Sequence, residues 1–314
     1  MKSKIKISML ALLFISAFVA CNSTSENSET SSTEQKEVVV NHDLGTTNVK
    51  TNPERVVVLD LGSLETLDQF GVKVVGTAKR NLPQYLSKFE DDSSVTDVGT
   101  LKEVNFEKIK ELNPDLIIIS GRLQNSYDEL SEIAPTIFMA VDNSDYLNSF
   151  EKNVRLLGEI FNKEEEAKKA LADVDVKIKE NQEQIEKIPG KALVVLYNNG
   201  RFSAYGKNSR FGFIHDVLGV KPAIEDLNVS THGNAISNEF IEQTNPDYLF
   251  IIDRGAIVNG KGAGKDEIEN ALIKQTNAYK NNKIIYLNPQ IWYLSGGGLI
   301  SINKMTDEVR EALK

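Results

Sequence analysis

The chain has 314 residues and a formal net charge of −9, from 36 basic and 45 acidic residues. This acidity disfavours nucleic acid as a partner, because binding nucleic acid depends on neutralising phosphates with Lys and Arg. Cys21 is the only cysteine, which excludes an internal disulfide.

Residues 1–20 have the features of a lipoprotein signal peptide. A basic start precedes an apolar run at residues 7–19 that is too short to span a bilayer well. A small residue then precedes Cys21, as in a lipobox, although Phe18 takes the place of the usual leucine. We expect cleavage before Cys21 and a diacylglyceryl anchor on its thiol. The alternative is an ordinary secretory signal followed by a free thiol. The first interpretation predicts a lipid-anchored protein on the extracytoplasmic face of a bacterial cell membrane.

Residues 21–37 are predicted to be a disordered tether. Between Cys21 and residue 38 there is no aliphatic or aromatic side chain, so this stretch cannot bury enough apolar surface to fold. We expect the globular body to begin at residue 38.

An N-terminal α/β lobe is predicted over residues 38–162. Short apolar runs alternate with segments of helical periodicity, which indicates a mainly parallel sheet because parallel neighbours need a crossover. The expected strands are 55–60, 71–76, 116–119 and 136–140, and the expected helices are 63–70, 105–112 and 127–133.

Residues 163–188 are predicted to be one long connecting helix. They contain no Gly or Pro, three Glu lie near their start, and Pro189-Gly190 follows them. Inward-facing apolar residues are sparse (Ala167, Ala170, Val174 and Val176). The segment is either a plain surface helix, or a piece of coiled coil with too few heptads, or a single rigid helix that connects two lobes. In the last case the lobes would not hinge far.

The α/β pattern restarts in a C-terminal lobe at residues 189–314. The expected strands are 192–197, 248–252 and 284–287, and the expected helices are 210–218, 238–244, 267–278 and 300–313. The predicted fold is therefore α/β, with two Rossmann-like lobes of mainly parallel sheet joined by one long rigid helix.

A repeated element relates the two lobes. NPDLIIISGR ends at Arg122 and NPDYLFIIDR ends at Arg254, and a Glu lies seven residues before each proline, at Glu107 and Glu239. Ligands of open α/β sheets collect at the carboxyl ends of strands, so the two arginines are candidate ligand-binding residues. The alternatives are strand-end salt bridges for the arginines and solvated helix positions for the glutamates.

The sequence resembles the substrate-binding lipoproteins of iron-siderophore ABC importers. The most specific segments are AYGKNSRFGFIHDVLG (204–219), HGNAIS (232–237) and WYLSGGG (292–298), beside the two NPD elements. The resemblance is to the helical-backbone class (class III), which includes the vitamin B12 and ferrichrome receptors. Within that class it is to receptors for catecholate siderophores of the petrobactin and enterobactin type.

This resemblance implies a receptor that binds a ferric catecholate siderophore between its lobes. Arg210, in the SRFG segment, joins Arg122 and Arg254 as a ligand-binding residue, because guanidinium stays charged and its planar fork suits catecholate oxygens. His232 and Tyr293 correspond to residues that complete Fe(III) coordination when a tetradentate siderophore leaves two positions open. With a hexadentate siderophore neither would need to touch the iron. Aromatic neighbours such as Tyr205, Phe211 and Trp292 either stack on catechol rings or belong to the core.

The resemblance also implies the protein's partners. Glu107 and Glu239 would bind arginine pockets on an ABC permease dimer, which works with its ATPase. We expect a monomer with no intrinsic cofactor, whose iron arrives as part of the ligand.

Other functions stay open at this point. The same fold serves hydroxamate siderophores, haem and cobalamin. A receptor for bare zinc or manganese would need several converging His and carboxylates, and the chain has only three scattered His. An enzyme is disfavoured because no G-x-S-x-G, P-loop or HExxH motif occurs.

Overall fold

The computed structural model describes residues 36–80 and 82–314. The predicted signal peptide, the lipidation site Cys21 and nearly all of the predicted tether lie outside these residues. The described chain opens with an antiparallel hairpin of β1 (Glu37–His42) and β2 (Gly45–Lys50). The first strand thus begins one residue before the predicted start of the lobe.

The first large sheet has five parallel strands in the order β5-β4-β3-β6-β7. Its strands are β3 (Val56–Val58), β4 (Gly76–Thr77), β5 (Thr96–Asp97), β6 (Leu116–Ile119) and β7 (Thr136–Phe138). The connecting helices and turns are α1 (Leu61–Gln69), η1 (Gln84–Leu86), α2 (Lys88–Asp91), α3 (Phe106–Glu111), η2 (Gly121–Ser126) and α4 (Tyr127–Ser131). The strand predicted at 71–76 is wrong except for its last residue.

The second sheet also has five strands, in the order β10-β9-β8-β11-β12. Its strands are β8 (Ala192–Asn198), β9 (Arg201–Tyr205), β10 (Asn234–Ile236), β11 (Tyr248–Asp253) and β12 (Ile284–Leu287). β8, β11 and β12 run parallel, whereas β9 is antiparallel to both of its neighbours. The expectation of mainly parallel sheets is confirmed for the first sheet, and the second is mixed.

The helices around the second sheet are short. They are α7 (Phe213–Asp216), α8 (Asn238–Thr244), α9 (Arg254–Val258), α10 (Lys265–Ile268), η3 (Ile273–Gln275), α11 (Asn277–Lys280) and η4 (Gln290–Leu294). The helix predicted at 210–218 shrinks to α7, because Asn208 takes a positive φ and residues 207–212 form turns. The helix predicted at 267–278 is broken because the Asn270 side chain accepts the amides of Leu272 and Ile273, which competes with helical bonding.

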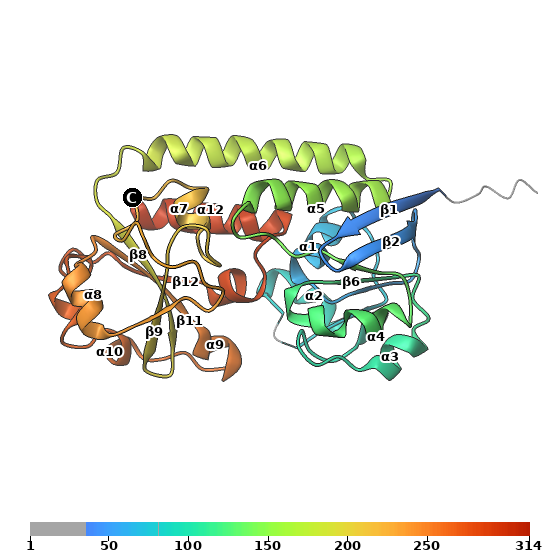
Figure 1. Ribbon diagram of the computed structural model, residues 1–314, viewed down its shortest axis with the longest axis horizontal. Coiled ribbons are helices and arrows are strands. Elements are labelled where there is room, and N and C mark those ends of the chain that lie inside the picture. The colour runs from blue at the N-terminus through green and yellow to red at the C-terminus, as the bar shows by residue number, and fades with distance from the viewer. Residues whose placement is uncertain (1–35, 81) are drawn as a thin grey trace, which may run out of the picture. The chain divides into compact units, whose positions relative to one another are not determined.

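Three long helices pack together above the sheets, as Figure 1 shows: α5 (Tyr146–Ile160), α6 (Glu164–Ile185) and α12 (Leu299–Leu313). α6 is the predicted connecting helix, and α5 beside it was not predicted. The buried face of α6 is carried by Ala167, Leu171, Val174, Ile178 and Ile185. Val176, expected to face inward, is instead 57% exposed. No helix in the described part of the chain has the length and apolar character needed to cross a membrane.

The Asn-Pro-Asp repeat has the same structure in both places. Asn113 and Asn245 each take a left-handed φ of 45° just past α3 and α8, which ends those helices. The Asp115 carboxylate then accepts backbone N–H groups just before β3. The Asp247 carboxylate does the same at Lys191, before β8. Each aspartate therefore ties the start of its own strand to the start of the neighbouring strand: β6 to β3 in the first sheet, and β11 to β8 in the second.

The apolar core is divided by the faces of the two sheets. Val56 and Val58 point into a cluster that runs on beneath α5, α6 and α12 and also takes in Val194 and Phe250 of the second sheet. Val57, with the opposite side-chain direction, belongs to a separate cluster on the far face. The second sheet has its own far-face cluster. The two sheets thus share one core on the side of the long helices.

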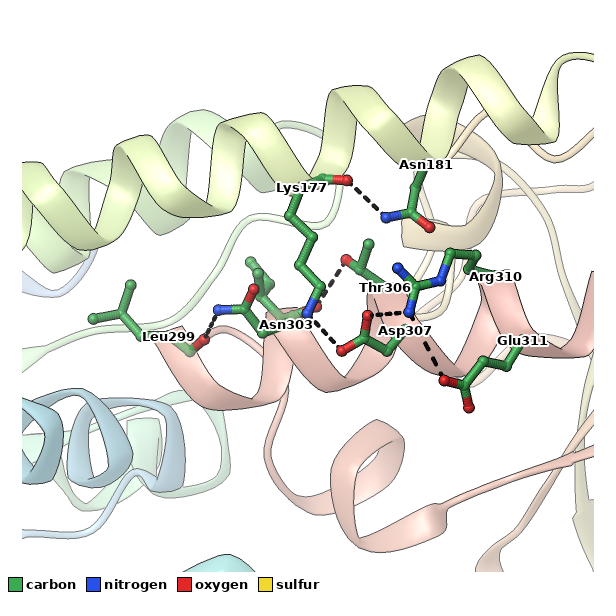
Figure 2. Close-up of polar contacts among 9 residues, drawn as sticks. Lys177, Asn181, Leu299, Asn303, Thr306, Asp307, Arg310 and Glu311 are labelled. Atoms are coloured by element: carbon green, nitrogen blue, oxygen red, sulfur yellow. Dashed lines mark hydrogen bonds and ion pairs between the residues drawn. The ribbon is translucent and has the colours of Figure 1, made fainter.

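Polar contacts reinforce this shared side. Lys177 Nζ of α6 lies 2.5 Å from Asp307 Oδ2 of α12, and Arg310 Nη2 lies 2.9 Å from Asp307 Oδ1 (Figure 2). α1, from the first half of the chain, also packs against α12. The contact between α1 and α12 therefore joins the two halves of the described chain in addition to α6.

Candidate ligand-binding site

Tyr293, in η4, is the point at which the three predicted arginines meet. Arg122 lies in η2 just past β6, and Arg254 begins α9 just past β11. Arg210 lies in the turn between β9 and α7. All four side chains are half-buried. Residues far apart in the sequence are thus brought to one aromatic ring from both sheets.

Arg254 contacts the hydroxyl end of the tyrosine. Its Nε donates to Tyr293 Oη at 2.9 Å, and its Nη1 donates to Asn198 Oδ1 at 3.0 Å. Asn198 is the last residue of β8, the strand next to β11. The neighbouring strand therefore fixes the direction of the guanidinium.

Arg122 and Arg210 hold the backbone of the same tyrosine. Arg122 Nη2 donates to the Tyr293 carbonyl at 2.5 Å, and Nη1 donates to the Leu294 carbonyl at 3.2 Å. Arg210 Nη2 donates to the Tyr293 carbonyl at 2.8 Å, and its Cζ lies 4.3 Å from the centre of the ring. Arg210 therefore stacks on the aromatic face while Arg122 approaches from the first half of the chain.

None of the three arginines forms an ion pair with a carboxylate of residues 36–80 or 82–314. The alternative that Arg122 and Arg254 are strand-end salt bridges is therefore wrong. Burial first, and then the charge of Arg210, lower the pKa of Arg122. The charge of Asp60 opposes this in part. Three half-buried cations whose hydrogen-bond partners are all neutral make a local environment that favours an anion.

The same charges act on the phenol of Tyr293. Burial raises its pKa, but the hydrogen bond from Arg254 and the charges of Arg210, Arg254 and Lys102 outweigh burial, so the pKa lies below its usual value. A phenol of this kind is more readily deprotonated, and phenolate oxygen is a hard ligand suited to Fe(III). Lys102 was not identified from the sequence, because it lies in a loop with no distinguishing motif.

His232 is not brought onto Tyr293 by any contact among the described residues. It is exposed, and its backbone N–H donates to Ser230 Oγ at 3.2 Å. The adjacent Gly233 has a φ of 73°, and a Cβ there would lie 2.7 Å from the ring of Tyr205. The pKa of Tyr205 is raised by burial and lowered in part by Arg210. The loop of His232 thus borders the arginine cluster through Tyr205.

The other aromatic candidates belong to the core. Tyr205 and Phe211 are each 1% exposed, with ring centres 4.6 Å apart, and Trp292 is 4% exposed. Trp292 Nε1 donates to Glu308 Oε2 at 2.7 Å, and burial raises the pKa of Glu308. Direct stacking of these three rings on a ligand is therefore ruled out in this conformation.

Glu107 and Glu239 occupy equivalent exposed positions, each 15 residues before the arginine of its repeat, Arg122 or Arg254. Each is the second residue of its helix, after the N-caps Asn105 and Ser237, whose side chains accept amides of the first turn. A hydrogen bond from its own backbone, followed by one from Ser237, lowers the pKa of Glu239. Both side chains are exposed.

Two further observations bear on the site. Within the described part of the chain, no three His, Cys, Asp or Glu side chains gather so as to hold a metal ion.

A surface hollow of about 630 Å³ lies between β1 and α5, lined among others by Val39, Lys152 and Arg155. None of the predicted site residues lines that hollow.

Comparison with known proteins places the chain in a family. A family model described as periplasmic binding protein matches residues 56–291. The petrobactin-binding protein YclQ of Bacillus subtilis is 46% identical over 98% of this chain and 99% of its own length. The ferric-anguibactin-binding protein FatB of Vibrio anguillarum is 39% identical over 87% of this chain and 86% of its own length.

Solved structures agree. The crystal structure of YclQ covers 89% of this chain and 99% of that protein with a TM-score of 0.87 and 47% identity. The catecholate-siderophore binding protein VctP of Vibrio cholerae gives a TM-score of 0.83 at 33% identity, with 88% of this chain and 100% of that protein covered. The chain belongs to the periplasmic binding protein family of ABC transport systems.

Proposed function

We propose that this chain is the extracytoplasmic receptor of an ABC importer, and that it binds a ferric catecholate siderophore at Arg122, Arg210 and Arg254. The observation that carries the proposal is the meeting of these three cations at Tyr293 without any carboxylate partner. A ferric tris-catecholate carries three negative charges and a ferric bis-catecholate one. Guanidinium groups could donate to such an anion in charge-assisted pairs.

The relatives support the chemical class of the ligand. YclQ is named for petrobactin, FatB for ferric anguibactin and VctP for catecholate siderophores. These names refer to siderophores or to a ferric siderophore complex, which favours a ferric siderophore over cobalamin or a bare metal ion. The family consists of binding proteins, and we propose binding and delivery as the role of this chain.

We further propose that Tyr293 and His232 complete the iron coordination of a tetradentate siderophore. The lowered pKa of Tyr293 supports the first ligand. His232 is exposed, on a loop whose next residue, Gly233, lies against Tyr205 beside the arginine cluster. With a hexadentate siderophore, neither residue would contact iron.

The proposed cell biology follows the predicted organisation. Cys21 would carry the lipid anchor, residues 21–37 the tether, and residues 38–162 and 189–314 the two lobes, joined by 163–188. Glu107 and Glu239 would dock on the two halves of an ABC permease dimer that is driven by its ATPase. Their equivalent places at the starts of α3 and α8 suit a partner with pseudo-twofold symmetry.

Fluorescence titration of the full-length protein in detergent tests the ligand. Trp292 is the only tryptophan and precedes Tyr293, so a ferric bis- or tris-catecholate should quench its emission. Ferric hydroxamate, haem, cobalamin, zinc and manganese are the comparison ligands. Tight zinc binding without quenching by any ferric catecholate would refute the proposal.

Variants locate the binding residues. Alanine at Arg122, Arg210 or Arg254 should each weaken binding by about 1.5–3 kcal/mol, as expected for a lost charge-assisted hydrogen bond. Arg155→Ala, which removes an exposed arginine paired with Glu151, is the control and should bind normally. Normal binding by all three site variants would exclude the arginine cluster.

Two paired comparisons test the remaining roles. His232→Ala and Tyr293→Phe should weaken a tetradentate complex and have little effect on a hexadentate one, and equal effects on both would exclude direct ligation. Glu107→Ala and Glu239→Ala should keep ligand binding but reduce iron uptake by cells. Glu183→Ala, at an exposed position of α6, should leave uptake unchanged.

A further inference from the structure

Glu65 is a fully buried carboxylate that joins α1 to the segment carrying Tyr293. Its side chain is 0% exposed. Its Oε1 accepts hydrogen bonds from Ser301 N at 2.7 Å and from Ser301 Oγ at 2.6 Å. Its Oε2 accepts from Tyr85 Oη at 2.5 Å and from Ser295 Oγ at 3.0 Å. This one carboxylate therefore accepts hydrogen bonds from α12, from η1 and from Ser295, the residue that follows η4.

The backbone between Ser295 and Ser301 is held at its helix end, where Gly298 N donates to Ser301 Oγ and Leu299 N donates to Thr66 Oγ1. It begins with three glycines, of which Gly296 and Gly297 have φ values of 68° and 95°, a region that favours glycine. A Cβ added at Gly298 would overlap Glu65 Oε1, so this tract runs directly over the carboxylate. Glu65 holds the residue before the tract and the first turn of the helix after it.

The hydrogen bond between Glu65 and Ser295 lies two residues from Tyr293 in the arginine cluster. Ser295 directly follows Leu294 and Tyr293, whose carbonyl oxygens are the acceptors for Arg122 and Arg210. A shift of the backbone at Ser295 would move those acceptors, together with the ring on which Arg210 stacks. Glu308 holds the other side of the segment, at Trp292, but it belongs to α12.

We propose that Glu65 is a positioning residue for the ligand site, which fixes Tyr293 against the arginines by holding both ends of the glycine tract. The inference rests on the proposed function of the same site. It assigns a role to a residue of the first half of the chain that does not itself contact the ligand.

The groups that face Glu65 favour this role. The pKa values of Tyr85 on η1 and Tyr146 on α5 are both raised, by burial first and by the charge of Glu65 second. Both phenols therefore stay protonated. Asp60, at the start of α1, raises the pKa of Tyr85 further, and Lys304 of α12 lies with its Nζ 5.5 Å from the Tyr85 ring. No cation pairs directly with Glu65 within the described residues, so its charge depends on the four hydrogen bonds.

Protonation of Glu65 would change its hydrogen bonds to the glycine tract. Burial raises the pKa of Glu65 to about 7, against the opposing effect of its hydrogen bonds. A proton on the carboxyl group needs an acceptor, and the backbone N–H of Ser301 cannot provide one. The hydroxyls of Tyr85, Ser295 and Ser301 can. A proton on Oε2 would reverse the hydrogen bond from Tyr85 or Ser295, and a proton on Oε1 would reverse the one from Ser301 Oγ, so either position changes how Glu65 holds the glycine tract.

Glu65→Gln is the matched variant, because glutamine keeps the volume and resembles the neutral state. Ferric bis-catecholate is titrated into full-length wild type and variant at about pH 8 and about pH 6, on either side of the pKa of about 7. We expect the variant to bind about tenfold more weakly at the higher pH, equivalent to about 1.4 kcal/mol. At the lower pH the two proteins should bind about equally. Thr306→Val, which removes a buried hydroxyl bonded within α12, should match wild type at both.

A second measurement needs no ligand. The emission of Trp292 in the unliganded protein should show a pH step near 7 that Glu65→Gln lacks. If wild type binds no ferric catecholate, the proposed function fails, and this step still decides whether Glu65 holds the segment. If the pH step in Trp292 emission survives in Glu65→Gln and disappears in Glu308→Gln, the step belongs to Glu308, and the inference is overturned.

Equal affinity of wild type and Glu65→Gln at both pH values would also overturn it, as would an equal loss at both, since a general structural defect does not follow the charge of one group. If Glu65→Gln does not fold, Ser295→Ala removes only the bond nearest the site. It should then weaken binding, and normal binding by Ser295→Ala would exclude the positioning role.

Discussion

Replacing Glu65 by glutamine should make the protein more stable at neutral and alkaline pH. The carboxyl group binds its proton more tightly in the folded chain, with a pKa of about 7, than at its ordinary value of 4.5. The protonated carboxyl group of Glu65 contributes its full stabilisation below pH 4.5, and this contribution is lost as the pH rises through about 7. Between these two values the folded state holds more protons than the unfolded state, so the free energy of unfolding falls as the pH rises.

The size of the effect follows from the same two values. Moving the pKa of Glu65 from 4.5 to about 7 corresponds to roughly 3 kcal/mol, at about 1.4 kcal/mol per pH unit. The side chain is completely buried, so solvent screening does not reduce this figure. Glutamine does not titrate, and the variant should keep the stability that wild type loses.

Urea unfolding of wild type and Glu65→Gln at a series of pH values measures this difference. His215 titrates in the opposite sense, because burial lowers its pKa and its contribution is lost as the pH falls. His215 is present in both proteins and cancels in the comparison. Parallel stability curves for the two proteins between pH 4.5 and about 7 would refute the reasoning. A variant that is more stable yet binds its ligand less well would reveal a trade of stability for function.

Three other changes have defined outcomes. Arg254→Ala should raise the pKa of Tyr293, because burial then acts with less opposition; ultraviolet titration against Tyr293→Phe measures it, and an unmoved curve would contradict the stated cause. Asp247→Ala should lower the free energy of unfolding by about 0.5–1.5 kcal/mol, because the exposed amide of Lys191 before β8 loses its carboxylate acceptor; urea unfolding measures this loss, and an unchanged free energy would contradict the reasoning. Gly298→Ala should lower the melting temperature, whereas Gly264→Ala, with open space at its Cβ, should not; equal melting temperatures would show that the close approach is tolerated.

Much of the fold could be predicted because local patterns and tertiary structure agree. β6, β12 and α8 have the predicted bounds or nearly so, since apolar runs and Asn or Ser caps mark them. The predicted connecting helix is present as α6. α5 was missed, although its buried residues have helical spacing. The break at Asn270 could not be foreseen, because it depends on which backbone amides the side chain reaches.

The site was predictable only in part. The repeat pointed to Arg122 and Arg254, and the family resemblance added Arg210 and Tyr293. That all three guanidinium groups meet on one tyrosine depends on contacts between segments up to 172 residues apart, which no local pattern records. Lys102 and Glu65 carried no signal, because a charged residue in a loop or helix is ordinarily a solvated one.

The shared core on the side of the long helices has a consequence for folding. Val56 and Phe250 belong to one apolar cluster although they lie on different sheets, and the same cluster includes residues of α5, α6 and α12. Neither half of the chain could bury its own inner face if it were synthesised alone. Unfolding should therefore be a single cooperative transition, and a truncated half should aggregate through the surface it can no longer cover.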